Sequence, residues 1–309
     1  MFHNRYPFLM IGLTLIPPCA ADEPTQDATR SLLRLTRDGL ETQRPNWSPD
    51  GRRLLYARHE ADGAHVWLYV LDVGAPGKAA PRRLTDRKGP EYNGVYSPDG
   101  TRILFAAITL SGTQGNLDIA TIDSDGSGLK TLVGDQGGKL SHQDWPSWSP
   151  DGRRFAFTST HEGNQELYTA CADGTDLVRL TQSPGIDAHP CWSPDGKTVA
   201  FATDRWGGLE LASVRPDGTT LVRLTRSTGL DDYPAYSPDG SRLAFVSNRD
   251  GQFEIYVTSA EGTGAMNLSR HSLRDTFPAW TPDGQGITFV SDRSGSAALY
   301  TLMFKPPVP

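Results

Sequence analysis

Short apolar runs separated by polar turns recur along most of the chain, in a pattern that is typical of β-strands. In one stretch, an apolar run at residues 243–246 is followed by a polar loop at 247–251 and by a second run at 255–257. Each unit ends in a third run that closes with Leu-Thr, as at Leu224 and Thr225 in the preceding unit. Together with a short strand at the start, this pattern predicts four strands per unit.

The start of each unit carries a five-residue motif of Trp or Tyr, Ser or Thr, Pro, Asp and Gly. Six copies occur, at residues 47–51, 96–100, 148–152, 192–196, 236–240 and 280–284. Their aspartates are Asp50, Asp99, Asp151, Asp195, Asp239 and Asp283, separated by 49, 52, 44, 44 and 44 residues. This period is close to the length of one four-stranded propeller blade. In such a turn Pro fixes φ, the Asp side chain bonds to the backbone, and Gly tolerates a positive φ.

The two ends of the chain complement each other. Residues 31–36 match the fourth strand of a unit, with Leu35 and Thr36 in the Leu-Thr positions, whereas the sixth unit stops at Pro309 without a fourth strand. An unpaired third strand would expose an edge that invites misassociation. We therefore expect an all-β, six-bladed β-propeller of four-stranded antiparallel blades over residues 31–305, closed by the N-terminal strand pairing in the last blade.

The units resemble the repeats of the TolB β-propeller family. The resemblance is carried by Pro-x-Trp-Ser-Pro-Asp-Gly, the apolar strand, a Ser-Asp-Arg-like loop and the Leu-Thr ending, and it covers about residues 31–305. It implies a propeller that binds partner proteins at one face, among them a peptidoglycan-associated lipoprotein. TolB also has an α/β domain ahead of its propeller, for which we expect no counterpart here.

The N-terminal residues have the layout of a secretory signal peptide. His3 and Arg5 precede an apolar run at residues 7–16, and small residues follow. We expect a signal peptide at 1–21 cleaved near Ala21, a flexible segment at 22–30, and a C-terminal tail at 306–309. Lipidation at Cys19 is an alternative, although Pro18 stands where a lipoprotein signal has a small residue. The expected location is the periplasm or the outside of the cell.

Composition and charge exclude some classes of partner. The 309 residues carry a formal net charge of −6, so the chain lacks the positive field that attracts nucleic acid. No other apolar stretch reaches the roughly 18 to 20 residues that a transmembrane helix needs. Cys171 and Cys191 fall on different predicted strands, so we expect free buried thiols. We also expect a monomeric propeller.

Loop lengths indicate which face of the propeller binds a partner. Relative to the 44-residue units, the first two units add nine residues on the face with the loops between strands two and three and between blades. They add four on the opposite face. Binding residues commonly lie on variable loops held by a rigid scaffold, so we favour the first of these faces.

An acidic set of residues lies on that face. Five positions before each Trp or Tyr of the motif the chain has Thr42, Glu91, Gln143, Asp187, Asp231 and Asp275. These side chains would form a partial ring at the channel mouth that suits a cation or a basic peptide. Alternatively, each Asp bonds the backbone of its own loop. The candidate binding residues are Glu91, Gln143, Asp187, Asp231, Asp275, His142 and His189.

Other recurring residues are interpreted as structural. His142, His189 and His271 have different offsets from the motif, so no metal site is predicted. Asp204-Arg205, Asn248-Arg249 and Asp292-Arg293 recur in equivalent loops, which favours ion pairs or loop caps over ligand binding. The motif aromatics are expected to pack between blades instead of stacking on sugars; they are Trp47, Trp148, Trp192, Trp280, Tyr96 and Tyr236.

No catalytic residue is predicted, because the sequence has no nucleophile elbow, phosphate-binding glycine loop or His-Glu-x-x-His motif. The predicted function is a protein-protein interaction or ligand-binding platform in the cell envelope, with an envelope protein or peptide as partner and no cofactor. The alternative is a periplasmic propeller enzyme acting on oligosaccharides, of the metal-assisted lyase or hydrolase type. A structural Ca²⁺ ion in the loops is also left open.

Overall fold

The computed structural model describes residues 30–74, 80–111, 114–134 and 141–304. These residues form β-strands and turns and include no helix, so none within these ranges has the length and apolar character needed to cross a bilayer. The predicted signal peptide and C-terminal tail lie outside the described residues.

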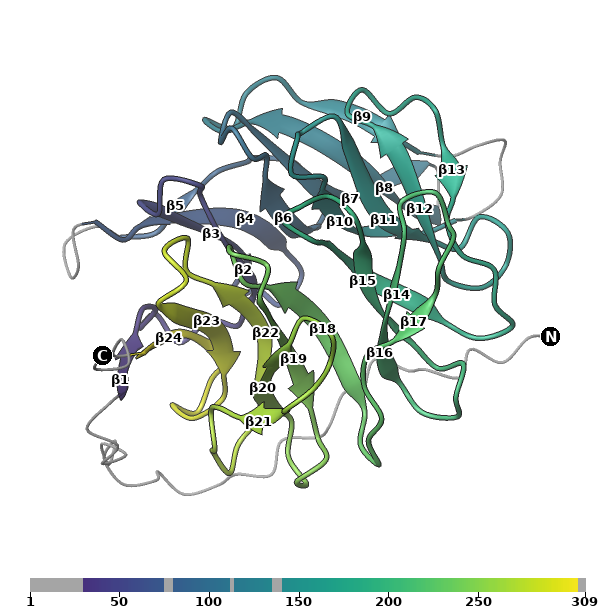
Figure 1. The fold of residues 1–309 in the computed structure, drawn as a ribbon. Helices are drawn as coiled ribbons and strands as arrows, with labels where there is room; N and C mark the ends of the chain where they lie inside the picture. Colours follow the sequence, from purple (N-terminus) through teal and green to yellow (C-terminus); the bar gives the residue numbers. More distant parts are fainter. Residues whose placement is uncertain (1–29, 75–79, 112–113, 135–140, 305–309) are drawn as a thin grey trace.

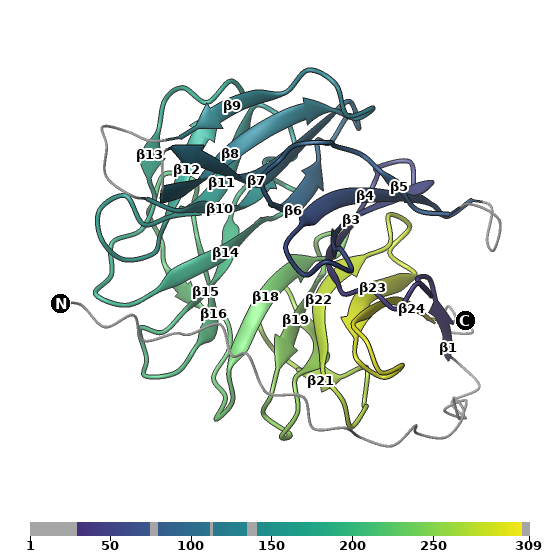
Figure 2. The same cartoon turned by 180° about the vertical axis from the view of Figure 1, so that it is seen from behind.

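Six four-stranded antiparallel sheets stand as blades around a central axis (Figures 1 and 2). In each blade the first strand is innermost. Blade 1 contains β2 (Thr42–Trp47), β3 (Arg53–His59), β4 (Val66–Asp72) and β5 (Arg82–Arg83). Blade 2 contains β6 (Glu91–Tyr96), β7 (Arg102–Ser111), β8 (Gln114–Asp123) and β9 (Lys130–Val133). Blade 3 contains β10 (Gln143–Trp148), β11 (Arg154–Ser159), β12 (Glu166–Cys171) and β13 (Val178–Arg179).

The remaining blades repeat this order. Blade 4 contains β14 (Asp187–Trp192), β15 (Val199–Thr203), β16 (Glu210–Val214) and β17 (Val222–Arg223). Blade 5 contains β18 (Asp231–Tyr236), β19 (Arg242–Ser247), β20 (Glu254–Ser259) and β21 (Met266–Asn267). Blade 6 contains β22 (Asp275–Trp280), β23 (Gly286–Ser291), β24 (Ala298–Phe304) and β1 (Arg30–Arg34).

Strand β1 closes the ring, as the sequence predicted. It pairs antiparallel with β24 in a register that runs from Arg30 opposite Phe304 to Arg34 opposite Tyr300. Beyond β1, the backbone N–H of Leu299 donates to the Thr36 hydroxyl at 2.9 Å. The Thr of the Leu-Thr ending makes the same bond in blades 3 and 4, where Thr181 and Thr225 accept from Leu167 and Leu211, each at 2.9 Å. A strand from the chain's beginning therefore docks as if it belonged to blade 6.

The six repeat motifs form the turns between first and second strands. In blade 1 the Ser48 hydroxyl donates to Asp50 Oδ1 at 2.6 Å, and the Arg52 N–H donates to the same oxygen at 3.1 Å. Gly51 has φ of 69°, and the equivalent glycines of the other blades lie between 67° and 72°. The turn chemistry inferred from the sequence is confirmed.

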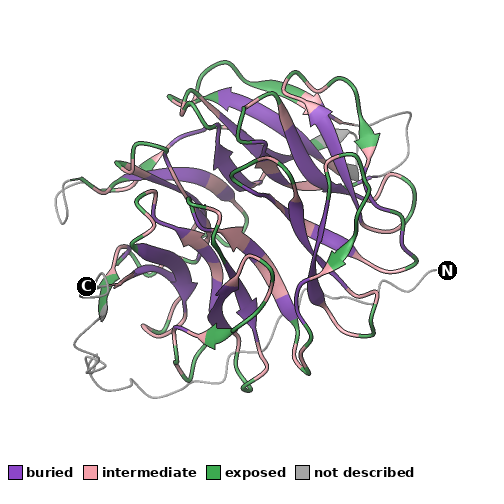
Figure 3. Ribbon diagram, viewed as in Figure 1, coloured by how far each residue is buried: buried purple, intermediate pink, exposed green. Residues whose placement is uncertain are grey.

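Aromatic side chains fill the blades and the spaces between them. One ring at the centre of each second strand is fully buried; these are Tyr56, Phe105, Phe157, Phe201, Phe245 and Phe289. The motif tryptophans reach the preceding blade, since Trp47 Nε1 donates to Thr288 Oγ1 and Trp280 Nε1 donates to the Ala235 carbonyl, both at 3.0 Å. Packing between blades is thus confirmed. Burial falls toward the rim, where β17 and β21 each consist of one exposed and one partly buried residue (Figure 3).

Buried ion pairs fix the loop between second and third strands to the start of the first strand of the same blade. Arg205, Arg249 and Arg293 pair with Asp187, Asp231 and Asp275, whose side chains are all fully buried. The residue before two of these arginines caps a loop, because Asp204 and Asn248 accept from the backbone N–H of Ile186 and Leu230 at 2.7 Å. The recurring loop residues therefore form ion pairs and loop caps, which is the interpretation that the sequence analysis favoured over ligand binding.

Blade 2 departs most from the repeat. Its strands β7 and β8 have ten residues each, whereas second and third strands of the other blades have five to seven. The long hairpin extends the face that the loop lengths favoured for binding.

Removing β1 should destabilise the whole ring. A chain shortened to begin after Thr36 leaves β24 with an unpaired edge, so we expect a lower and broader thermal transition by circular dichroism. A chain that begins at Arg30 retains β1 and is the matched control. Equal melting temperatures for the two truncations would contradict closure by β1.

The motif turns should weaken in acid. Hydrogen bonds from Ser97, Ser193 and Ser237 and from backbone N–H groups lower the pKa values of Asp99, Asp195 and Asp239 to about 2. Because the unfolded value is about 4, this stability is present above that pH and is lost as pH falls toward 2. The variant Asp195→Asn/Asp239→Asn should flatten the acid limb of a plot of melting temperature against pH. An unchanged limb would contradict this assignment.

Breaking one buried ion pair should be costly. Arg249→Met leaves the buried Asp231 carboxylate without its cation, and such breaks cost about 3–5 kcal/mol. The Arg249 side chain is 21% exposed, so we expect a loss of about 3 kcal/mol in the free energy of unfolding, measured with urea. Adding Asp231→Asn removes the stranded charge and should restore part of the loss. A single-variant loss below about 0.5 kcal/mol would contradict the pairing.

Candidate functional site: a cavity on the propeller axis

A β-bulge interrupts every innermost strand, and in five of the six blades the residue at the bulge lines a cavity on the axis. The register between first and second strands shifts at the same place in all six blades, for example between Gln43 and Asn46 in blade 1 and between Asp232 and Ala235 in blade 5. The third residue of each innermost strand lies in this bulge with φ between 42° and 57°. These residues are Arg44, Asn93, Trp145, His189, Tyr233 and Phe277. We call them the bulge ring.

The local sequence favours the bulge. In five of the six blades a proline follows the bulge-ring residue, as Pro146 follows Trp145 and Pro190 follows His189. Proline has no N–H to give to the strand ladder, so it is tolerated at a bulge and not within regular pairing. Positive φ in a non-glycine residue costs free energy and is retained where the surrounding structure over-determines it.

Four members of the bulge ring form an aromatic plug. Ring centroids lie 4.3 Å apart for Trp145 and His189, 4.4 Å for His189 and Tyr233, and 4.7 Å for Tyr233 and Phe277. Trp145 of blade 3 also lies 6.0 Å from Phe277 of blade 6, across the axis. We use the name aromatic plug for these four residues.

Arg44 completes the ring beside the plug. Its guanidinium carbon lies 4.7 Å from the centroid of the Trp145 ring. Nη1 donates to the Asn93 carbonyl at 3.3 Å and Nη2 donates to the Pro146 carbonyl at 3.0 Å, so the side chain links blades 1, 2 and 3. Burial lowers the pKa of Arg44 to about 10, which leaves it protonated at neutral pH.

Two carboxylates support the plug. Asp144 Oδ1 accepts from Asn93 Nδ2 and from the Trp145 N–H, both at 2.7 Å. Burial raises the pKa of Asp144, and these hydrogen bonds oppose the rise. Asp232 Oδ1 lies 2.5 Å from His189 Nδ1, which fixes the orientation of the imidazole.

The plug forms one end of a cavity of about 290 Å³. All six innermost strands contribute to its lining, which places it on the axis. Pro238 and Pro282 of the motif turns lie at its other end, on the face opposite to the long β7–β8 hairpin. Aromatic residues and prolines make up most of the wall.

Most of the predicted binding residues lie elsewhere. Of that set, only His189 lines the cavity. Glu91, Gln143, Asp187, Asp231 and Asp275 have exposed fractions of 0–2%, and His142 is exposed. The three aspartates are held in the ion pairs described above. Glu91 accepts from the Thr85 hydroxyl, and burial raises its pKa.

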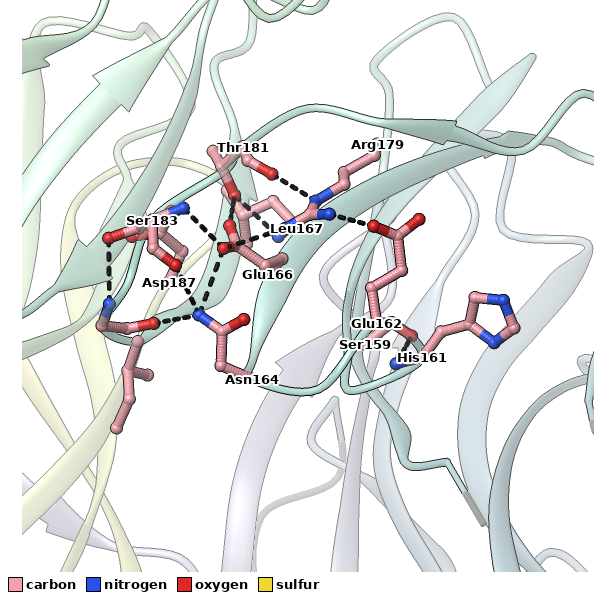
Figure 4. Close-up of polar contacts among 12 residues, drawn as sticks. Ser159, His161, Glu162, Asn164, Glu166, Leu167, Arg179, Thr181, Ser183 and Asp187 are labelled. Carbon is pink, nitrogen blue, oxygen red and sulfur yellow. Dashed lines mark hydrogen bonds and ion pairs between the residues drawn. The ribbon is translucent and has the colours of Figure 1, made fainter. Parts of the chain in front are cut away.

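A polar network centred on Glu166 joins blade 3 to its linker toward blade 4 and lies beside Asp187 (Figure 4). Glu166 accepts from the Thr181 hydroxyl and from the Ser183 N–H, both at 2.6 Å, and from Arg179 at 3.2 Å. Burial raises the pKa of Glu166, but these hydrogen bonds more than offset that effect and hold it below its usual range. We therefore interpret this network as a structural contact that holds β12 to the segment after β13.

Among the described residues, no three His, Cys, Asp or Glu side chains gather in a way that suits a metal ion. Cys171 and Cys191 are free thiols, as predicted, although both are partly exposed. Cys191 lines the cavity, and burial raises the pKa of its thiol.

Sequence reasoning missed five of the six bulge-ring residues. A signal was present: the residue before the Pro or Gly is Arg, Asn, Trp, His, Tyr or Phe, whereas the Pro after it recurs in five repeats and a Trp or Tyr ends the strand in all six. Among the six positions of these strands, only this one carries a different residue in every repeat.

Comparisons with known proteins agree with the fold. The chain is 31% identical over 98 residues to the Tol-Pal system protein TolB of Thioalkalivibrio sulfidiphilus (strain HL-EbGR7); the match spans 32% of this chain and 22% of that relative. The chain thus matches less than a quarter of that relative's length.

Solved structures share the architecture. A TolB structure from Agrobacterium tumefaciens is similar with a TM-score of 0.67 at 21% identity, over 90% of this chain and 98% of that one. An oligogalacturonate lyase from Vibrio parahaemolyticus has a TM-score of 0.61 at 17% identity, over 90% and 94%. At these identities the likeness concerns the fold alone.

The family model described as the TolB beta propeller domain matches residues 127–230 and 219–306, more than half of the chain. The repeat motif, the six blades and this match agree. The chain belongs to the TolB β-propeller domain family.

Proposed function

We propose that this chain is an exported binding platform that takes up a segment of another envelope protein at its axial cavity. The observation that carries the proposal is the bulge ring. Six blades share one backbone geometry at that position, yet their side chains differ in size, polarity and charge. A purely structural position in a repeat has no need of such variety, whereas a binding site does.

The size and lining of the cavity favour a protein segment. Ligand sites usually measure about 300–1,000 Å³, and this cavity of about 290 Å³ lies at the lower limit. That volume suits one or two side chains of a segment lying across the mouth better than an oligosaccharide. Trp145, Tyr233 and Phe277 supply the rigid aromatic surface that dominates protein-binding sites.

The cellular location is part of the proposal. The N-terminal sequence has the layout of an export signal, and a relative is named as a protein of the Tol-Pal system. We infer that the platform works in the cell envelope. The motif turns that line the cavity lie on one face of the propeller, and the long β7–β8 hairpin extends the other face. The proposed role does not depend on this hairpin, which offers a second surface for contact.

An enzyme acting on oligosaccharides is the second candidate, because the His189–Asp232 pair resembles a base with its orienting carboxylate. The Cys191 thiol does not supply a nucleophile for this pair. Cys191 Sγ donates to the Trp192 carbonyl at 3.7 Å, and its raised pKa disfavours the reactive thiolate. The binding function therefore has more support.

Crosslinking in intact cells tests the platform. The wild-type chain should capture an envelope protein, and Trp145→Ala should reduce capture at least tenfold, because buried tryptophans are frequent hot spots. Met266→Ala, at an exposed apolar residue of the rim, is the matched control. Melting curves check that each variant folds.

Two outcomes would contradict the proposal. One is the absence of any captured protein with the wild-type chain. The other is equal capture by wild type and Trp145→Ala, which would place binding away from the axis. Hydrolysis or elimination of an oligosaccharide by the purified chain, lost in His189→Ala, would favour the enzyme instead.

A further inference from the structure

The axial cavity contains one permanently charged side chain. Arg44 is its only Arg or Lys, and no Asp or Glu appears among the described residues that line it. His189 is the one other basic residue, and its Nδ1 is already engaged by Asp232. The rest of the wall is mainly aromatic, aliphatic and proline. The electrostatic character of the cavity therefore depends on Arg44.

The Arg44 guanidinium retains unused donors. Of its five N–H groups, two are directed at the Asn93 and Pro146 carbonyls. Among the described residues, no carboxylate oxygen lies within the 4.0 Å of an ion pair to this guanidinium. The nearby Asp144 carboxylate stabilises the guanidinium electrostatically but does not contact it. An arriving carboxylate can therefore form the direct ion pair that the described residues leave unmade.

The nearby acids do not line the cavity. Asp144 and Asp232 each precede a bulge-ring residue by one position, and neither is a lining residue. Oδ1 of Asp144 accepts from Asn93 Nδ2 and the Trp145 N–H, and Oδ1 of Asp232 lies against His189 Nδ1. Among the described lining residues, Arg44 therefore carries the only permanent charge.

We propose that Arg44, positioned over the Trp145 ring, binds a carboxylate of the ligand, while the aromatic and proline walls take an apolar side chain beside it. This inference rests on the proposed function and names the chemistry that its site recognises. Arginine suits the task because its planar fork can donate two parallel hydrogen bonds to one carboxylate. The ligand would enter from the face of the motif turns, since Pro238 and Pro282 of those turns line the cavity and the plug lies at its other end.

The carboxylate has two sources in a peptide, the chain terminus and an acidic side chain. Three probes distinguish them: acetyl-Pro-Phe with a free terminus, acetyl-Pro-Phe-amide, and acetyl-Glu-Pro-Phe-amide. Binding to the full chain is measured by calorimetry and by quenching of tryptophan fluorescence. At least one carboxylate probe should bind about tenfold or more tightly than the uncharged amide, and the tighter of the two identifies the source.

Variants assign the effect to Arg44. Arg44→Gln should weaken the preferred carboxylate probe by about ten- to a hundredfold and leave the amide probe unchanged. Arg44→Lys keeps the charge without the planar fork and should fall between wild type and Gln. Arg82→Gln, at an exposed arginine of the rim strand β5, should bind as wild type does.

Cys191 gives an independent readout because its thiol lines the same cavity. The preferred probe should slow alkylation of Cys191 by N-ethylmaleimide and leave that of Cys171 unchanged, as resolved by peptide mass spectrometry. Equal binding of all three probes to the wild-type chain would overturn the inference, even if Arg44→Gln failed to fold. So would unchanged carboxylate binding in a folded Arg44→Gln variant.

The outcomes separate this inference from the proposed function. Capture of an envelope protein that persists in Arg44→Gln but is lost in Trp145→Ala would overturn carboxylate recognition and leave the platform standing. Selective binding of a carboxylate probe without any captured protein would support the Arg44 site and contradict the platform.

Discussion

Closure of the ring is the constraint on which the rest of this structure depends. A four-stranded blade has two apolar faces and buries each only against a neighbour, so the set is stable when the last blade meets the first. Here that contact requires β1 to pair with β24, and the Thr36–Leu299 hydrogen bond repeats what other blades make internally. Once the ring is closed, six innermost strands face one axis and their side chains must share it.

The bulge decides what happens at that axis. A regular strand alternates its side chains between its two faces, whereas a bulge re-aims one residue per blade, and five of these six residues line the axial cavity. Because the residue there changes from blade to blade, a symmetric scaffold presents an asymmetric site. The aromatic plug forms because blades 3 to 6 all carry an aromatic side chain at the bulge. Arg44 supplies the only permanent charge among the described residues that line the cavity.

Polar groups in this propeller divide into two kinds. Asp187, Asp231 and Asp275 are fully buried and paired with arginines of their own blades, which makes them joints of the scaffold. Arg44 lines the cavity, donates hydrogen bonds to two carbonyls, and contacts no carboxylate among the described residues. A buried ion pair in direct contact belongs to the scaffold, whereas a guanidinium without such a contact can still bind the carboxylate of a ligand. Residue type alone did not distinguish them, which is why the acidic positions were candidates for binding.

The sequence by itself determined the blade count, the four-stranded unit, the turn chemistry, the inter-blade tryptophans and the closing strand. All of these depend on short-range patterns that repeat, so one copy explains the others. Only the tertiary structure decided which side chains meet at the axis, because Arg44, Trp145 and Phe277 belong to blades far apart in sequence and are brought together by closure. Whether a charged residue has a partner depends on distances that no spacing along the chain encodes.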